Sequence, residues 1–155
     1  MNRILRHYLL LPLLAAIPTL AAADPSVPSS EEIDQAIVQA AHLYRVDPNL
    51  MRAIALVESQ NNPYVIGDNG RAFGLFQINY WVRKYDIPPE QMFDVRRNAM
   101  WGAFALSECR KSYPYDFWMT VGCFNVGADG KPYRAAVNYA WRVHRALQKV
   151  MLERH

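Results

Sequence analysis

The sequence predicts a mainly α-helical domain with one short irregular or β-like loop region. Two observations lead to this fold class. Apolar residues recur at helical spacing in several segments that begin with a capping residue, and no two alternating segments are joined by a hairpin turn. A stretch that contains Gly67, Gly70 and Gly74 interrupts the helical pattern and predicts the loop region.

The first 23 residues have the features of an export signal. Arg3 and Arg6 form a basic start, residues 9–20 are mostly apolar, and three alanines precede Asp24 as a small-residue cleavage site. The apolar run is short for a transmembrane helix. We therefore expect a signal peptide over 1–23 and an exported domain over 24–155, with no membrane attachment after cleavage.

Length and charge bound the function. The 132 residues that remain of 155 after position 23 suit one domain with one cleft. The chain has 17 basic and 14 acidic residues, and loss of Arg3 and Arg6 with the signal leaves 15 basic residues. Such a balance lacks the basic excess of nucleic-acid-binding domains, so we expect no nucleic acid partner.

A first helix is predicted after Pro28 as a packing element. Ser29 and Glu32 can form a capping box, in which each side chain bonds the backbone N–H of the other residue. The apolar residues that follow at helical spacing are Ile33, Ile37, Ala40, Ala41 and Tyr44.

A second helix, predicted over residues 47–59, points a carboxylate inward. Asp47 can cap its first turn, and Pro48 suits the first helical position because no N–H donor is needed there. Glu58 lies four residues after Ile54 and therefore shares its apolar face. An inward Glu is either a structural acid, paired with an arginine or with backbone donors, or a reactive acid in a dry cleft.

The loop after this helix favours the reactive acid. Its glycines let the backbone approach a ligand closely, and it closes on an apolar pair that flanks Gln77. The aromatic residues Tyr80, Trp81 and Tyr85 come next, and they indicate either core packing or a platform for sugar rings.

Three further helices complete the predicted domain. Asp94 caps a helix whose inward stripe consists of Ala99, Gly102, Ala103, Leu106 and Cys109. Asp116 caps the next, with an inward set of Trp118, Val121 and Phe124. The last runs from Tyr133 to Leu152, and its apolar side consists of Ala136, Ala140, His144, Leu147 and Met151.

The cysteines and histidines suggest a disulfide rather than a metal centre. An exported chain with two cysteines invites a bridge, and antiparallel packing of their two helices allows Cys109 and Cys123 to meet without requiring it. No spacing of Cys and His matches a metal site. We expect no metal and no cofactor.

Several blocks of the sequence resemble the soluble lytic transglycosylase (SLT) family. They occur in the family's order between positions 47 and 143, and they are Glu58-Ser59 with Asn62-Pro63, the run from Gly74 to Ile78, the run from Cys123 to Gly127, and Tyr139 with Val143. The chain departs from the family at Phe76, which is usually Met, and at Phe124, which is usually Tyr. Gly67 also lies where some members have a cleft Ser.

The resemblance implies a lysozyme-like fold and cleavage of the β-1,4 bond between N-acetylmuramic acid and N-acetylglucosamine in peptidoglycan. It implies that Glu58 acts first as acid and then as base. The substrate's acetamido group and C6 hydroxyl would act as nucleophiles, so that the product is a 1,6-anhydro sugar. The resemblance further implies that Tyr139 orients Glu58. The other matched residues are expected at the substrate. Gly74 and Phe76 would line the cleft, and Gln77 and Asn125 would be cleft amides that bond either sugar or backbone. Ser59, the motif partner of Glu58, has either a place at the substrate or a structural role.

Two alternatives to this interpretation remain open. The loop around Asp68 is similar to goose-type lysozyme, a hydrolase in which the corresponding Asp is thought to help position water. Asp before Asn-Gly is also ordinary turn chemistry, and Asn79 stands where the lysozyme loop ends in Asp, so we favour the transglycosylase. The other alternative is a wall-binding structural component without turnover.

The small size resembles that of specialised transglycosylases that open the wall for secretion systems, pili or flagella. That likeness implies a periplasmic location. It also implies peptidoglycan strands as substrate and proteins of an envelope machine as partners.

Overall fold

The structure is a computed structural model that describes residues 27–79, 88–128 and 130–153. The expected signal peptide over 1–23 and the aromatic residues Tyr80, Trp81 and Tyr85 lie outside these ranges.

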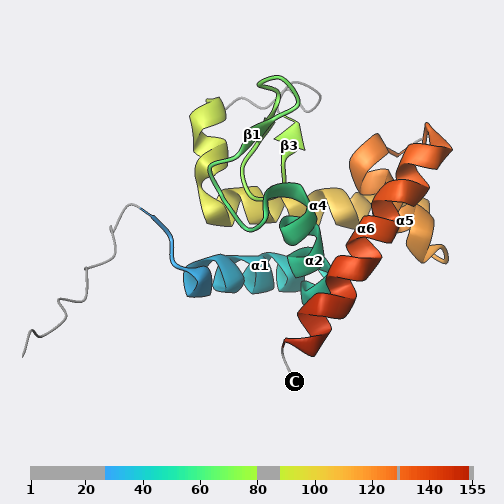
Figure 1. Ribbon diagram of the computed structural model, residues 1–155, viewed down its shortest axis with the longest axis horizontal. Coiled ribbons are helices and arrows are strands. Elements are labelled where there is room, and N and C mark those ends of the chain that lie inside the picture. The colour runs from blue at the N-terminus through green and yellow to red at the C-terminus, as the bar shows by residue number, and fades with distance from the viewer. Residues whose placement is uncertain (1–26, 80–87, 129, 154–155) are drawn as a thin grey trace, which may run out of the picture.

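Within the described residues, the α-helices pack on one another and a small antiparallel sheet lies beside α4 and η1, so the expected mainly α fold is confirmed. The helices are α1 (Ser30–Tyr44), α2 (Pro48–Ser59), η1 (Pro89–Phe93, a 3-10 helix), α4 (Val95–Ser112), α5 (Phe117–Val126) and α6 (Tyr133–Leu152). The strands are β1 (Ile66–Gly67), β2 (Ala72–Phe73) and β3 (Ile78–Asn79). Figure 1 shows the strands and η1 near one end of α4, and α5 and α6 near the other. No helix of the described chain is long and apolar enough to cross a bilayer.

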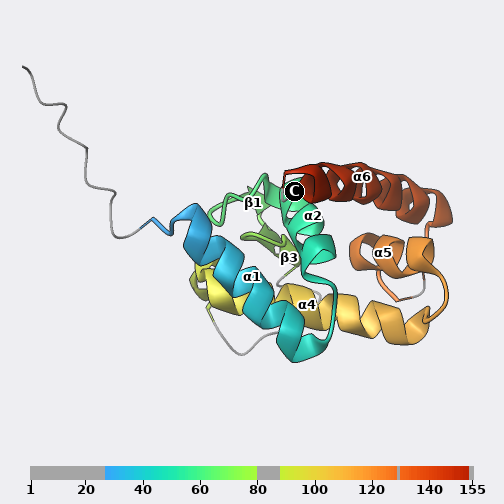
Figure 2. The same cartoon turned by 90° about the horizontal axis from the view of Figure 1, so that it is seen from below.

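Helix α2 is the central packing element. It contacts α1 on one side and α6 on the other, while α4 packs against both α1 and α5 (Figure 2). Met51, Ala53 and Ile54 on α2 are completely buried. The C-terminal turn of α2 points toward the strands, so the residue at position 58 lies near the sheet.

The predicted caps are present and explain where the helices begin. Ser29 and Glu32 bond each other's backbone N–H in a complete capping box. The side chains of Asp47, Asp94 and Asp116 each accept a hydrogen bond from the first turn of the helix that follows.

The glycine-rich stretch forms a three-stranded antiparallel sheet in the order β1-β2-β3. Ile66 pairs with Phe73 and Ala72 pairs with Asn79. The turn between β1 and β2 places Asp68, Asn69 and Gly70 at positive φ, which small polar residues and glycine tolerate best. The expected β-like loop is therefore a short sheet with one strained turn.

The inward stripe predicted for α4 is buried along its whole length, but the one predicted for α6 is partly wrong. Ala136 and Ala140 are buried as expected, whereas Met151 is 48% exposed. The buried face continues instead through Tyr139, Val143 and Val150. Steps of four residues rotate around a helix by roughly 40° each, so a stripe drawn with such steps leaves the core after a few turns.

A disulfide joins α4 to α5. Cys109 and Cys123 are bonded through their Sγ atoms, and both residues are buried. The bridge holds α5, whose C-terminal end borders the site described below, against the long α4 helix.

Candidate active site

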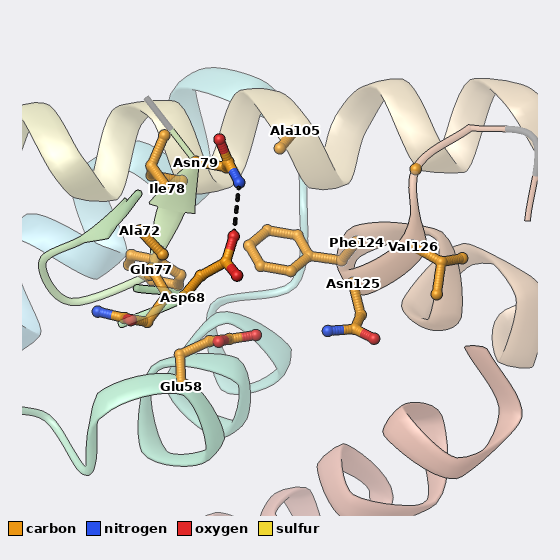
Figure 3. Close-up of a pocket in the computed structure, with 12 residues that line it drawn as sticks. Glu58, Asp68, Ala72, Gln77, Ile78, Asn79, Ala105, Phe124, Asn125 and Val126 are labelled. Carbon is orange, nitrogen blue, oxygen red and sulfur yellow. Dashed lines mark hydrogen bonds between the residues drawn. The ribbon is translucent and has the colours of Figure 1, made fainter. Parts of the chain in front are cut away.

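A cleft of about 580 Å³ lies between the end of α2, the sheet and the end of α5 (Figure 3). This volume is typical of small-molecule sites. The polar side chains that line the cleft are Glu58, Asp68, Gln77, Asn79 and Asn125. Its apolar walls include Ala72, Phe76, Ile78, Ala105 and Phe124. The cleft thus combines two carboxyl groups and three amides with apolar walls.

Glu58 lies in the last turn of α2 and points into the cleft (Figure 3). The helix ends just after it, because Gln60 adopts a left-handed conformation with φ 55°. Tyr139 of α6 donates a hydrogen bond from its hydroxyl to Oε1 of Glu58 over 2.6 Å. The side chain that helical spacing turned inward is therefore held by a phenol and not by an arginine.

The surroundings of Glu58 favour its protonated form. Burial raises the pKa of the Glu58 carboxyl, because a charged carboxylate loses solvation there. The Tyr139 hydrogen bond and the positive charge of Arg142 act in the opposite direction, and burial outweighs both. A carboxyl in this state can give up a proton to a leaving group in the cleft.

Tyr139 is suited to remain a hydrogen-bond donor. Only 1% of the residue is exposed, and its ring lies nearly parallel to that of Phe124, with centroids 6.4 Å apart. Burial, followed by the neighbouring Glu58 carboxylate, raises the pKa of Tyr139 well above its usual range. The phenol thus contacts the acid and does not itself line the cleft.

Asp68 brings a second carboxyl to the cleft, across from Glu58 (Figure 3). Its Oδ2 accepts a hydrogen bond from the Asn79 amide over 3.1 Å, and its Oδ1 forms an ion pair of 2.9 Å with Arg71. The residue itself sits at φ 48° in the strained turn. Asp68 therefore has both of the features that the sequence left open, a turn position and a place in the cleft.

Gln77 fixes the shape of the loop. Its side-chain Nε2 donates to the carbonyls of Val65 and Gly74, and its backbone adopts φ 46°. A Cβ atom built on Gly67 would lie 2.2 Å from Oε1 of Gln77. The glycine that replaces a cleft Ser of some family members thus leaves room for this amide. Both amide hydrogens of Gln77 serve the backbone, and the residue forms part of the cleft wall.

Two residues of the matched motif are structural. This corrects the expected place of Gly74 in the cleft wall, and it gives Ser59 the structural one of its two expected roles. Ser59 is buried, and its hydroxyl donates to the carbonyls of Ala55 and Leu75, so it ties α2 to the loop. Gly74 is also buried and does not line the cleft; it has φ 77°, and a Cβ there would lie 2.5 Å from the Met92 carbonyl. Both residues hold the loop in position beside Glu58.

Phe76 and Asn125 do line the cleft, as the sequence predicted. Phe76 is completely buried, and its ring packs so closely on Gly102 of α4 that a Cβ there would lie 2.6 Å from it. Asn125 is exposed near the C-terminal end of α5, at the end of the cleft away from Gln77 (Figure 3). Its neighbour Phe124 gives this end an apolar surface.

Asn98 is an important residue that the sequence analysis missed. It is completely buried on α4, and its amide donates to the carbonyls of Phe73 and Met92 while its Oδ1 accepts from the backbone N–H of Phe76. These bonds fasten the sheet to α4. The sequence indicates this buried role only by placing a polar Asn on the helix face that also contains Ala99 and Gly102.

The described residues contain no group of three or more His, Cys, Asp or Glu side chains that could hold a metal ion.

Comparison with known proteins identifies the family. The family model described as "Transglycosylase SLT domain" matches residues 35–140. The chain is 32% identical over 127 residues to the "Invasion protein IagB" of Salmonella typhimurium (strain SL1344), with 75% of this chain and 79% of that protein covered. It is 34% identical over 92 residues to the "X polypeptide" of Escherichia coli (strain K12), with 54% of each chain covered. The chain belongs to the transglycosylase SLT domain family.

Proposed function

We propose that the protein is a lytic transglycosylase that cleaves the β-1,4 bond between N-acetylmuramic acid and N-acetylglucosamine in peptidoglycan. The observation that carries the proposal is the environment of the Glu58 carboxyl in the cleft. Burial raises the pKa of this carboxyl, and a hydrogen bond from Tyr139 holds its orientation. Membership of the SLT family supports peptidoglycan as the substrate.

In the proposed first step, Glu58 gives its proton to the glycosidic oxygen while the acetamido oxygen of the muramic sugar attacks C1. The C1–oxygen bond breaks, the N-acetylglucosamine leaves as a neutral alcohol, and Glu58 becomes a carboxylate. Tyr139 stabilises that carboxylate, because a hydrogen bond to an ionised acceptor is stronger than one to a neutral acceptor.

In the proposed second step, the Glu58 carboxylate removes the proton from the C6 hydroxyl of the same sugar. The C6 oxygen attacks C1 and displaces the acetamido oxygen, which yields a 1,6-anhydro sugar. Glu58 is protonated again, and no water is consumed. One acid is sufficient because the substrate supplies both nucleophiles.

A second candidate function is hydrolysis, and the position of Asp68 favours it. A carboxylate on the far side of the cleft from Glu58 resembles the two-carboxylate arrangement of many glycosidases. Against it, both oxygens of the Asp68 carboxylate already have a partner within the protein, one in Arg71 and the other in Asn79. We therefore favour the transglycosylase.

The products separate these functions. Purified sacculi incubated with the exported domain should release muropeptides with 1,6-anhydro ends, and Glu58→Gln should lower the rate by at least about a hundredfold, as expected for loss of a general acid. Asp68→Asn should leave the anhydro product in place. Reducing ends that disappear in Asp68→Asn would establish the hydrolase instead, and absence of any release would indicate a wall-binding component.

We also propose an export signal over 1–23, an enzymatic domain over 24–155 and a periplasmic location, because peptidoglycan is reached only after export. One relative is named an invasion protein. That name supports the proposal that the enzyme opens the wall locally for an envelope machine such as a secretion system.

A further inference from the structure

Helix α6 carries a strongly basic exposed face next to the cleft. It contains four basic side chains, Arg134, Arg142, Arg145 and Lys149, and no Asp or Glu between Tyr133 and Leu152. The exported domain as a whole is close to neutral, so this helix concentrates its positive charge. Arg142, Arg145 and Lys149 are spaced three and four residues apart, and like charges at this spacing destabilise a helix slightly, which suggests that an anion binds there.

An open groove of about 840 Å³ lies on this face of α6. Asn138, Arg142 and Arg145 line it at positions i, i+4 and i+7, and they therefore share one side of the helix. Trp141 forms part of its wall and is 53% exposed.

The groove adjoins the cleft. Asn125 lines both of them, and Tyr139, which lines the groove, bonds the Glu58 carboxyl in the cleft. A substrate that extends from Glu58 past Asn125 therefore reaches the guanidinium groups of α6.

The two arginines of the groove form no ion pair with another described residue. The ion pairs of this part of the chain engage Arg52, Arg71, Lys111 and Lys149, and neither Arg142 nor Arg145 takes part. The Arg142 guanidinium lies over the Tyr139 ring, 5.4 Å from its centroid, and this contact holds it beside the site. Both arginines are exposed and can receive a carboxylate in a bidentate manner.

We infer that this groove binds a carboxylate of the stem peptide that peptidoglycan carries on its muramic acid. The inference rests on the proposed function, since it assigns the peptide part of the same substrate. The peptide branches from the sugar ring that would lie next to Glu58, and its acidic residues are the nearest anions of such a polymer. Arg145 is the main ligand, and Arg142 assists it while also acting on Glu58 through its charge.

The test compares two substrates prepared from the same sacculi. One consists of soluble glycan strands that retain their stem peptides, and the other of strands whose peptide carboxylates have been converted to amides. Arg145→Gln should lower kcat/KM on the acidic strands by roughly tenfold or more, the effect of losing one charge-assisted hydrogen bond. The same variant should change kcat/KM on the amidated strands by less than about twofold, because no carboxylate is left to bind.

Arg134→Gln is the matched control, because Arg134 is exposed on the same helix but does not line the groove. It should behave as the unaltered protein on both strands. Equal losses in Arg145→Gln and Arg134→Gln would show a diffuse attraction to a polyanion and overturn the inference. An Arg145→Gln loss that is the same on acidic and amidated strands, or no loss at all, would also overturn it.

A second readout needs no turnover and separates this inference from the proposed function. The Glu58→Gln protein should sediment with sacculi more strongly than the Glu58→Gln/Arg145→Gln protein, and amidation of the sacculi should remove the difference. If the unaltered protein released nothing while this difference persisted, the proposed function would fail and the peptide site would stand. Equal sedimentation of both proteins would refute the site. Preferential binding of the protein to vesicles of anionic phospholipid, lost in Arg145→Gln, would assign the groove to a membrane instead.

Discussion

Removal of the Tyr139 hydroxyl should weaken the protein mainly when Glu58 is ionised. Tyr139→Phe keeps the buried ring, so the change isolates one hydrogen bond, 2.6 Å from Oη to Oε1 of Glu58. A hydrogen bond to a charged group contributes about 1.5–3 kcal/mol, and one between neutral groups contributes about 0.5–1.5 kcal/mol. The free energy of unfolding should therefore fall by about 1.5–3 kcal/mol at mildly alkaline pH and by less at acidic pH.

A double-mutant cycle measures the charged part of this contact. The four proteins are the unaltered chain, Tyr139→Phe, Glu58→Gln and the double variant, and their unfolding free energies come from urea titrations at both pH values. Gln retains an acceptor oxygen but no charge, so the coupling energy should be larger at alkaline pH. A coupling energy near zero, or one that does not change with pH, would refute the view that the phenol bonds an ionisable carboxyl.

Three further perturbations follow from the same structure. Glu58→Gln should raise the Tm relative to the unaltered protein at alkaline pH and lose that advantage in acid. Burial places the pKa of Glu58 in the folded protein above its value in the unfolded chain, so the unaltered protein loses stability as pH rises through the folded pKa. Asn98→Leu should cost about 2–4 kcal/mol in urea unfolding, because two buried carbonyls and the N–H of Phe76 lose their partner. Joint replacement of Cys109 and Cys123 by Ala should cost about 2–3 kcal/mol and lower the Tm, since the bridge closes a loop with a sequence separation of 14; an unchanged Tm would contradict its structural role.

Local sequence signals predicted the helices well. Each predicted cap bonds its own first turn, and such contacts depend only on residues three or fewer positions apart. Helical spacing likewise placed Glu58 on the inner side of α2. The end of the α6 stripe was predicted poorly, because the predicted positions rotate around the helix and the packing of α6 against α2 and α5 buries Val150 instead of Met151.

Contacts between residues that are far apart in the sequence could not be predicted from residue spacing. The pair Tyr139 and Glu58 is separated by 81 positions, and only the family resemblance suggested it. Asn98 bonds three backbone groups from other segments, which no local pattern reveals.

The family motif did not separate residues that line the cleft from those that support it. Ser59 and Gly74 match the motif as closely as Gln77 does, yet they are buried beneath the loop. Resemblance to a motif shows which residues occur together, but only the three-dimensional structure distinguishes residues that line the cleft from residues that support the loop.

The most direct test of the central claim is a pH titration of the Glu58 carboxyl by carbon NMR, run beside the pH profile of sacculus cleavage. The account predicts a Glu58 pKa above that of an ordinary glutamate, with cleavage declining as pH rises through the same value, and a further upward displacement of both in Tyr139→Phe because the hydrogen bond lowers that pKa. A Glu58 pKa at or below the ordinary value, or cleavage that continues unchanged after Glu58 has lost its proton, would contradict its role as the proton donor.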